Sequence, residues 1–283
     1  MTRFDDRAQE LLNRLREDYE SGATALALDT LRGLAAYVEA TDPHPTDLTP
    51  LLHELRNARP SMIVIGNAMA KVEALLNGGD MPQAVVNQVT RELDNAGSAI
   101  ARHAISKIPA NAVVMTHSAS SVVLALFRLL ARKQHRFSVI CTQSSPGMEG
   151  HQLALALNDL GIAVTLITDA QMGLFVSRAD VVITGCDTWL ADGHFINKSG
   201  TCLLALAARA HHKPFWVLGD SFRKSDQASD DVTLEEMPVS ELHAPEGDWI
   251  TPRNIYFETV PESLVTGGIN EQGAFSFPDS PQQ

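Results

Sequence analysis

The sequence predicts a two-domain α/β protein, with a helical N-terminal part and a C-terminal domain built on a parallel sheet. Between about residues 5 and 106, apolar residues recur every three or four positions, the spacing of amphipathic helices. After Ile108-Pro109 the pattern changes to short β-branched runs that alternate with helical stretches. A chain of 283 residues is also long enough for two domains. We therefore expect a helical domain over residues 1–108 and an α/β domain over residues 109–283.

Breaks in the helical pattern divide the N-terminal part into four or five helices. Gly and Pro end helices, and Asp or Thr can cap the helix that follows. Such breaks fall at Glu20-Ser21-Gly22, at Asp42-Pro43-His44-Pro45 and at Asn77-Gly78-Gly79-Asp80.

Short apolar runs predict the strands of the second domain, at residues 112–116, 137–141, 163–168, 180–184 and 214–218. Because these runs are continuously apolar, the strands should be covered on both faces, as in a parallel sheet. Helices at about residues 119–132, 148–159 and 200–210 would supply the cover.

Composition and charge exclude several classes of protein. Hydrophobic residues make up 45% and charged residues 20% of the chain, which is ordinary for a globular protein. The formal net charge of −12 and the lack of a basic run argue against direct binding of nucleic acid. No apolar run approaches the length of a membrane span, and the polar N-terminus does not resemble a signal peptide. Three cysteines without metal-like spacing suit reduced thiols, so we expect a cytoplasmic protein.

Polar residues follow four successive predicted strands. In an open parallel sheet the loops at the carboxyl ends of the strands converge with helix N-termini, whose free N–H groups favour anions. The segments in question are 116–121, 142–150, 169–171 and 185–187, followed by Asp192-Gly193 and by Asn197-Lys198-Ser199-Gly200-Thr201. These segments predict a polar pocket for a small, phosphorylated ligand.

Each of these segments also has a purely structural interpretation. Serines between a strand and a helix, such as Ser118 to Ser121, are often simple N-caps, and Asp187 could cap a turn. The lysine before the Gly-led helix start at Gly200 would suit an anion, although the order of a P-loop is missing. Neither G-x-G-x-x-G nor H-E-x-x-H occurs, so we expect no dinucleotide cofactor and no metal site.

The same segments resemble the family of eukaryotic translation initiation factor 2B alpha, beta and delta subunits, which includes methylthioribose-1-phosphate isomerase and ribose-1,5-bisphosphate isomerase. The most specific part, VVITGCDTWLADGHFINKSGT at 181–201, is similar to the family's strand, G-A-D, D/N-G and N-K-x-G-T series. Further similar segments are THSASSVV (116–123), SSPGMEGHQLA (144–154), GIAVTLITDAQ (161–171), NIYFETVPESLVTGGINEQG (254–273), SGATALALDTL (21–31) and ARPSMIVIGNAM (58–69).

The resemblance implies a fold, an assembly and a ligand. The expected fold is an N-terminal helical domain followed by a Rossmann-like α/β domain, with a homodimer formed through the latter and a sugar phosphate bound between the domains. In the isomerases of the family, a cysteine and an aspartate move protons between the first two carbons of an aldose 1-phosphate. Such chemistry needs an acid and a base at adjacent carbons, in a site closed to water.

The resemblance also assigns residues to roles. Asp187 matches the catalytic aspartate, and Ser118 stands at the position of the catalytic cysteine. The ligand-binding positions that follow from the matched segments are Gly22, Ala23, Arg59, His117, Glu149, Gly150, Asn197 and Lys198.

Three departures from the isomerases weaken the case for catalysis. A serine hydroxyl at Ser118 does not ionise readily near neutral pH without a strong base beside it, unlike a thiol. Ser145 and Ser21 occupy positions where the isomerases have arginines. Cys186 is adjacent to Asp187, but adjacent strand residues face opposite sides, so it is a poor substitute.

These observations leave several hypotheses open. The first is a protein that binds a phosphorylated sugar or related metabolite and acts as a sensor or assembly subunit. The second is a working sugar-phosphate isomerase, in which Asp187 is assisted by Ser118 or His117. A role in translation and a purely structural protein with a vestigial pocket are the remaining alternatives. Whether the chain is an enzyme is not decided by the sequence.

Overall fold

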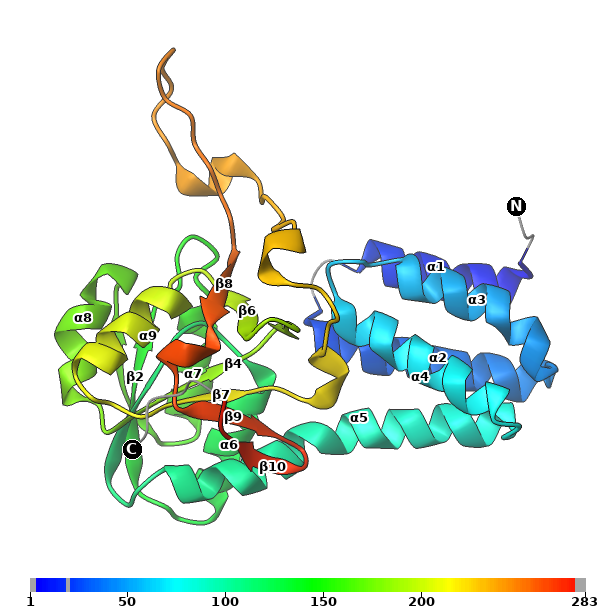
Figure 1. The fold of residues 1–283 in the computed structure, drawn as a ribbon, viewed down its shortest axis with the longest axis horizontal. Coiled ribbons are helices and arrows are strands. Elements are labelled where there is room, and N and C mark those ends of the chain that lie inside the picture. Colours follow the sequence, from blue (N-terminus) through cyan, green and yellow to red (C-terminus); the bar gives the residue numbers. More distant parts are fainter. Residues whose placement is uncertain (1–3, 19–20, 278–283) are drawn as a thin grey trace. The chain divides into compact units, whose positions relative to one another are not determined.

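Figure 1 shows the computed structural model of the chain, which describes residues 4–18 and 21–277. The chain divides into two compact units. The first consists of Met1–Ala96 together with Phe222–Lys224, and the second of Gly97–Ser221 together with Ser225–Gln283. The units divide inside helix α5 (Pro82–Ala104), whereas the boundary expected at residues 108–109 falls just before the first strand.

The first unit is helical. Its helices are α1 (Asp6–Glu17), α2 (Ala23–Thr41), α3 (Pro45–Asn57), α4 (Ile63–Asn77) and the first part of α5. Local signals fix their ends: the Asp5 carboxylate caps α1 by accepting from the Ala8 N–H, and Pro45 opens α3. Leucines at helical spacing, such as Leu31, Leu34 and Leu52, form the core of the unit. The predicted series of helices is confirmed.

The second unit is built on a seven-stranded sheet with the order β10-β9-β7-β4-β1-β2-β3. The pairs β1–β2, β1–β4, β2–β3, β4–β7 and β7–β9 are parallel, and only β10 runs antiparallel. The strands are β1 (Ala112–Thr116), β2 (Phe137–Thr142), β3 (Ala163–Ile167), β4 (Val181–Gly185), β7 (Phe215–Leu218), β9 (Gly267–Asn270) and β10 (Gly273–Phe275). A smaller antiparallel sheet contains β5 (Thr188–Trp189), β6 (His194–Lys198) and β8 (Phe257–Pro261).

Helices cover both faces of the large sheet, as the continuous apolar runs predicted. Alternate residues of each strand enter different cores: Trp216 and Leu218 join the core under α5, α6 (Ser121–Arg132) and α7 (Glu149–Asp159). Phe215 and Val217 join the core under α8 (Met172–Phe175) and α9 (Thr201–Ala210). Figure 1 shows these helices on the two sides of the sheet. The predicted Rossmann-like parallel-sheet architecture after a helical part is confirmed.

Strand order puts a switch point of the sheet at the carboxyl ends of β1 and β4. The chain leaves β1 toward β2 and β3 on one side, then returns to add β4 on the other side. Connections that diverge in this way leave room beyond the strand ends for a ligand. The two neighbouring strands are followed by His117-Ser118 and by Cys186-Asp187 respectively.

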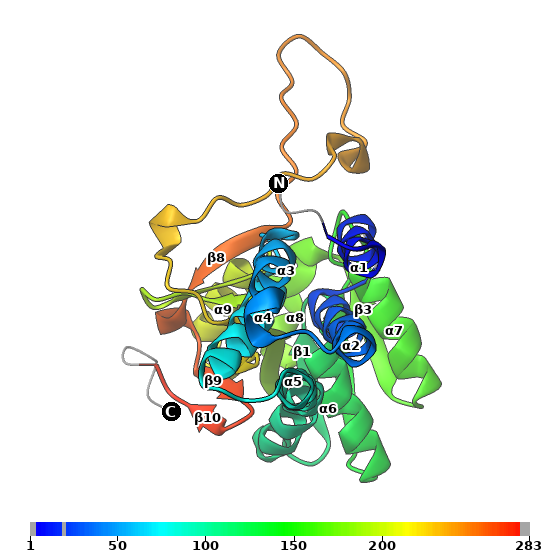
Figure 2. The ribbon, with the colours of Figure 1, turned by 90° about the vertical axis from the view of Figure 1, so that its right-hand side faces the viewer.

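A long segment between β7 and β8 leaves the body of the second unit. Residues 225–255, which we call the arm, contain only the short 3₁₀ turns η5 (Ser229–Asp231) and η6 (Val239–Leu242) and one isolated bridge between Glu236 and Ile255. In both views the arm extends away from the sheet (Figures 1 and 2). Within the described ranges, no helix combines the length and apolar character needed to cross a membrane.

Candidate ligand site at the strand ends

His117 is buried at the end of β1, with both ring nitrogens engaged. Its Nε2 lies 2.8 Å from the carbonyl oxygen of Ser199, and its Nδ1 lies 2.7 Å from Thr142 Oγ1. Because a carbonyl oxygen can only accept, the hydrogen of the neutral ring is on Nε2, and the Thr142 hydroxyl donates to Nδ1. Burial lowers the pKa of His117, although the Asp169 carboxylate, 3.9 Å from Nδ1, opposes that shift. The ring is therefore neutral at neutral pH and held in one tautomer.

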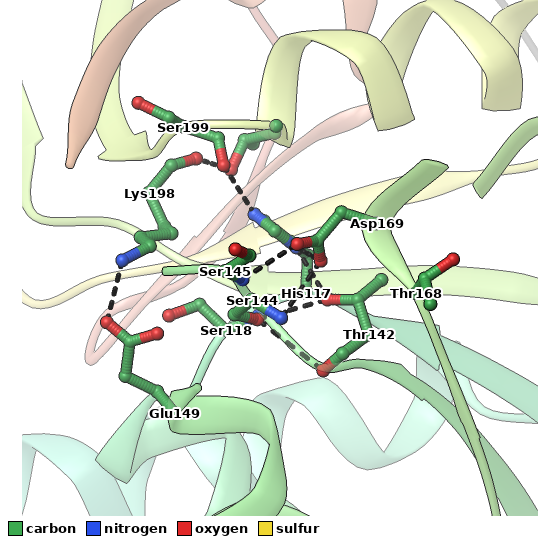
Figure 3. Close-up of polar contacts among 12 residues, drawn as sticks. His117, Ser118, Thr142, Ser144, Ser145, Glu149, Thr168, Asp169, Lys198 and Ser199 are labelled. Atoms are coloured by element: carbon green, nitrogen blue, oxygen red, sulfur yellow. Dashed lines mark hydrogen bonds and ion pairs between the residues drawn. The ribbon is translucent and has the colours of Figure 1, made fainter. Parts of the chain in front are cut away.

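A chain of hydroxyl groups connects this ring to the backbone of Ser118 (Figure 3). Since Thr142 donates to the ring, its oxygen accepts from Ser144 Oγ at 3.0 Å. Ser144 Oγ in turn accepts the Ser118 N–H at 2.8 Å. Both serines have positive φ, 63° at Ser118 and 61° at Ser144, a conformation that is strained for a residue other than glycine and clusters at functional sites. The ring thus helps to fix the backbone at the position that follows β1.

Asp169 holds the loop that follows β2. Its Oδ1 accepts the Ser144 N–H at 2.9 Å, and its Oδ2 accepts the Ser145 N–H at 2.7 Å. Both oxygens of one carboxylate are therefore used to orient consecutive peptide groups. The loop leads into α7, and an added Cβ at its second residue, Gly150, would lie 1.7 Å from the carbonyl oxygen of Thr142. Only glycine allows the start of α7 to approach the end of β2 this closely.

The close packing at Gly150 brings the preceding residue, Glu149, to Lys198 at the end of β6. Lys198 has only 3% of its side chain exposed, and its Nζ donates to Glu149 Oε1 at 2.7 Å. The same Nζ lies 3.6 Å from the ring centroid of Tyr256, a cation–π contact. Burial, together with the Glu241 carboxylate that accepts from the phenol at 2.6 Å, raises the pKa of Tyr256. The lysine is therefore held by one carboxylate and one neutral aromatic ring.

Glu149 has a second oxygen that is not used in this way. Its Oε2 is buried and has no hydrogen-bond partner among the described residues. A buried carboxylate oxygen without a donor is costly, so a ligand hydroxyl or a water molecule would be favoured there. Figure 3 shows Glu149 and Lys198 beside the His117 network, on the side of Ser118.

The start of α9 is already occupied by a carboxylate of the chain itself. Glu258 Oε1 accepts the N–H groups of Gly200 at 2.7 Å and of Cys202 at 2.9 Å. The sequence predicted that this helix start would suit an anion, and the anion found there is Glu258. Asn197, which is 6% exposed, donates from Nδ2 to Thr201 Oγ1 at 2.9 Å and so ties β6 to α9.

Ser118 and Asp187 follow the neighbouring strands β1 and β4. Asp187 is partly exposed, and its N–H donates to the Ile196 carbonyl at 2.9 Å, which joins the end of β4 to β6. Ser120 is the N-cap residue of α6 but makes no capping hydrogen bond through its side chain. Among the residues that the structure describes, no group of three or more His, Cys, Asp or Glu side chains could hold a metal ion.

Comparison with known proteins identifies the family. Residues 19–277 match the model of the Initiation factor 2 subunit family. The chain belongs to the initiation factor 2 subunit family. A putative translation initiation factor eIF-2B subunit 2-like protein of Pyrococcus abyssi is 33% identical, over 95% of this chain and 96% of its own.

One of the relatives of this chain is an isomerase. The ribose 1,5-bisphosphate isomerase of Archaeoglobus fulgidus is 29% identical, over 94% of this chain and 88% of its own. The crystal structure of the translation initiation factor eIF-2B of Pyrococcus horikoshii OT3 superimposes with a TM-score of 0.81 at 30% identity, covering 97% of this chain and 98% of that one. Family membership, which the sequence motifs suggested, is thereby confirmed.

The ligand-binding positions expected in the helical part lie in the first unit of this family member. Gly22 is the N-cap of α2 and has open space beside it, and Ala23 is the first residue of that helix. The Arg59 guanidinium donates to the backbone carbonyl of Asp18. Sequence analysis did not single out Arg223, which is 9% exposed and donates to Thr24 Oγ1 at 2.8 Å. A buried guanidinium at the first turn of α2 adds positive charge beside Gly22 and Ala23.

Proposed function

We propose that this protein binds a phosphorylated sugar or a related small phosphorylated metabolite and acts as a sensor or assembly subunit. The observation that carries the proposal is the Lys198–Glu149 pair beside Ser118, the residue that follows β1 (Figure 3). Lys198 offers a buried cation for a phosphate, and the Glu149 Oε2 atom, buried and without a described donor, offers an acceptor for a sugar hydroxyl. A site with both groups at 2.7 Å suits a ligand that carries both functions.

Several features argue against the usual isomerase chemistry. The nitrogens of His117 are directed at Thr142 and Ser199, so this neutral ring is not placed to deprotonate the Ser118 hydroxyl. Burial raises the pKa of Cys141 to about 11 and also raises the pKa of Cys202, so neither thiol supplies a thiolate in place of the family cysteine. The proposal is therefore binding without turnover of the family substrates.

An aldose–ketose isomerase acting on a sugar 1-phosphate is the second candidate. It is favoured by Asp187, which is present at the position of the family aspartate and follows β4 next to the strand that carries Ser118. The similarity to a ribose 1,5-bisphosphate isomerase also extends over most of the chain. The roles of Asp187, Asn197 and Gly150, and those of Gly22, Ala23 and Arg59, remain predictions. A homodimer and a cytoplasmic location belong to the same proposal.

Binding and turnover can be measured separately. Ribose 1,5-bisphosphate, methylthioribose 1-phosphate and nucleoside monophosphates are added in a thermal-shift assay, since a ligand of the native state raises the unfolding midpoint. We expect at least one sugar phosphate to raise the midpoint, Lys198→Ala to abolish the rise, and no isomer to form. Turnover by the wild type that is lost in Asp187→Asn would instead establish the isomerase. No shift with any phosphorylated compound would contradict both candidates.

Position 118 can be tested directly. Ser118→Cys restores the residue that the isomerases carry, with little change in volume. Activity that appears only in this variant would show that one atom separates binding from catalysis in this chain. If Ser118→Cys also shows no activity, the next variants to test are at Ser21 and Ser145, where the isomerases have arginines.

A further inference from the structure

The tip of the arm presents an exposed aromatic side chain. Trp249 is 98% exposed, and its neighbour Ile250 is 45% exposed. Tryptophan is enriched at the centres of protein interfaces and is costly to leave in water. Such exposure means that the Trp249 side chain does not pack against the part of the chain that the structure describes.

The arm is braced at its root rather than loosely attached. The Met237 N–H donates to the Asn254 carbonyl at 2.7 Å, which joins the two sides of the arm. The buried Asn254 donates from Nδ2 to the Pro238 carbonyl at 2.9 Å and to Glu241 Oε2 at 3.0 Å. At the tip, the Ile250 N–H donates to the Gly247 carbonyl at 3.0 Å and closes a turn. A braced segment that projects away from its unit (Figures 1 and 2) is pre-organised for docking.

Charge restricts the surface on which the arm can dock. Residues 225–255 contain eight acidic residues and one arginine, a net charge of −7 out of −12 for the whole chain. Two of these carboxylates, Glu246 and Asp248, flank the tip. A matching surface must therefore combine exposed apolar side chains with positive charge.

Helix α9 carries a surface of that kind. Leu203 is 66% exposed and Leu206 is 49% exposed, and the spacing of three puts them on one side of the helix together with Arg209. We call these three residues the α9 face. The opposite side of α9 packs into the core through Leu204 and Ala208. Lys213, shortly after the end of the helix, adds positive charge beside the face.

Two other exposed leucines, Leu155 and Leu166, lack this combination. Leu155 on α7 is 59% exposed and Leu166 on the edge strand β3 is 45% exposed. The acidic residues Asp159 and Asp169 lie close to them in the chain, and these would repel the acidic tip. Charge therefore favours the α9 face over the β3 edge.

We propose that Trp249 of one copy docks on the α9 face of a second copy of this chain, and that two such contacts, related by a two-fold axis, hold a dimer. A two-fold dimer uses the same pair of surfaces twice, so the arm and the α9 face of each copy are both covered. The complementary partner surface is present on the chain itself, which is why a second copy is the chosen occupant. This inference specifies the homodimer of the proposed function and rests on it.

The association is tested with two exposed substitutions and a matched control. Sedimentation equilibrium at micromolar concentration should give a dimer for the wild type. Trp249→Ala and Leu206→Ala should each raise the dimer dissociation constant at least tenfold, about 1.4 kcal/mol. Leu166→Ala, an equal truncation on the β3 edge, should leave it unchanged. All three side chains are exposed, so circular dichroism should confirm that folding is intact.

Cross-linking tests the docking partner itself. In a Cys202→Ser background, which removes a partly exposed native thiol, Trp249→Cys and Leu206→Cys chains are mixed and oxidised. We expect a disulfide-linked pair containing one chain of each kind. Cross-linking of Trp249→Cys to Leu166→Cys instead would overturn the proposal in favour of the β3 edge. A dimer that survives both alanine substitutions would overturn the arm contact and leave the homodimer standing, whereas a monomeric wild type would remove both.

Discussion

The Lys198–Glu149 pair permits a prediction in which stability and ligand affinity change in opposite directions. Glu149→Gln keeps the shape of the side chain and removes its charge. The lost interaction is a charge-assisted hydrogen bond of 2.7 Å to a lysine with 3% of its side chain exposed. Such bonds contribute about 1.5–3 kcal/mol, and the lower end applies here because Glu149 is 31% exposed. At about 2–4 °C per kcal/mol for a chain of this size, the unfolding midpoint should fall by roughly 3–6 °C.

Affinity for an anion should increase in the same variant. In the wild type a phosphate must compete with the Glu149 carboxylate for Lys198 and is repelled by it. Removing that charge should tighten the binding of inorganic phosphate about tenfold, or about 1.4 kcal/mol. A sugar phosphate should gain less, because it also loses the charged acceptor at Oε2 that its hydroxyl would use.

Calorimetric titration at low salt measures the affinity for inorganic phosphate and for ribose 1,5-bisphosphate. Glu236→Gln is the matched control, because its ion pair with Arg253 is exposed and belongs to the arm. This control should leave both the midpoint and phosphate affinity unchanged. The reasoning would be refuted if Glu149→Gln bound phosphate no better than the wild type, or if its midpoint did not fall.

Three further predictions concern stability. The pKa of His117 in the folded state is lowered below 6.5, so in acid the unfolded chain binds more protons than the folded chain. The free energy of unfolding should therefore fall as the pH drops below 6.5. In urea unfolding, His117→Gln should lose less of this free energy over the same pH range. Burial, with repulsion from Asp192, raises the pKa of Glu262 from 4.5 to about 7, so ionisation of this carboxyl destabilises the fold as the pH rises between those values. The free energy of unfolding of Glu262→Gln, relative to that of the wild type, should therefore be higher at pH 8 than at pH 5. Gly150→Ala should destabilise the fold by about 3 kcal/mol or more, because the added Cβ would lie 1.7 Å from a backbone oxygen. Gly97→Ala, in a helix with open space beside it, should instead stabilise the fold by up to about 1 kcal/mol. Denaturant titrations measure both changes.

The main sheet could be predicted from the sequence because its central strands β1, β4 and β7 are buried on both faces, and the edge strand β3 still carries a short apolar run. The run at 112–116 coincides with β1, and the runs at 137–141 and 163–168 each differ from β2 and β3 by one residue. Continuous β-branched stretches leave little ambiguity when glycine or proline bounds them. The helices that follow β1 and β2 were located nearly as well, since their apolar spacing is regular, whereas the short helix α8 after β3 was not predicted.

The later strands could not be predicted in this way. Strand β9 contains Gly267 and Gly268, residues that are depleted in strands, so the local sequence argues against one. The structure needs these glycines because an added Cβ at Gly267 would lie 2.4 Å from the Phe275 backbone oxygen. The close approach of β10 outweighs the low strand propensity of glycine here. The sequence around residue 267 alone does not predict that contact.

The candidate site could also be predicted only in part. Motifs placed Ser118 in the loop after a strand and Lys198 just before a helix start, and the structure has Ser118 after β1 and Lys198 shortly before α9. They could not reveal that His117 is fixed by Thr142 and by Ser199, which lie 25 and 82 residues away. Nor could they reveal that the α9 start is filled by Glu258, because that contact spans 58 residues. Residue type predicts which groups can bind a phosphate, but only tertiary structure shows which of them are already used.

The root of the arm and the candidate ligand site share one side chain. Tyr256 covers Lys198 with its ring, and its hydroxyl donates to Glu241, which lies in the arm. Glu241 also accepts from Asn254, which braces the two sides of the arm. A partner that holds the arm therefore also restrains the ring over Lys198, because three consecutive contacts, none longer than 3.6 Å, connect them. The proposed assembly through the arm and the proposed binding of a phosphate would therefore both act on Lys198, which is the arrangement that a metabolite-sensing subunit requires.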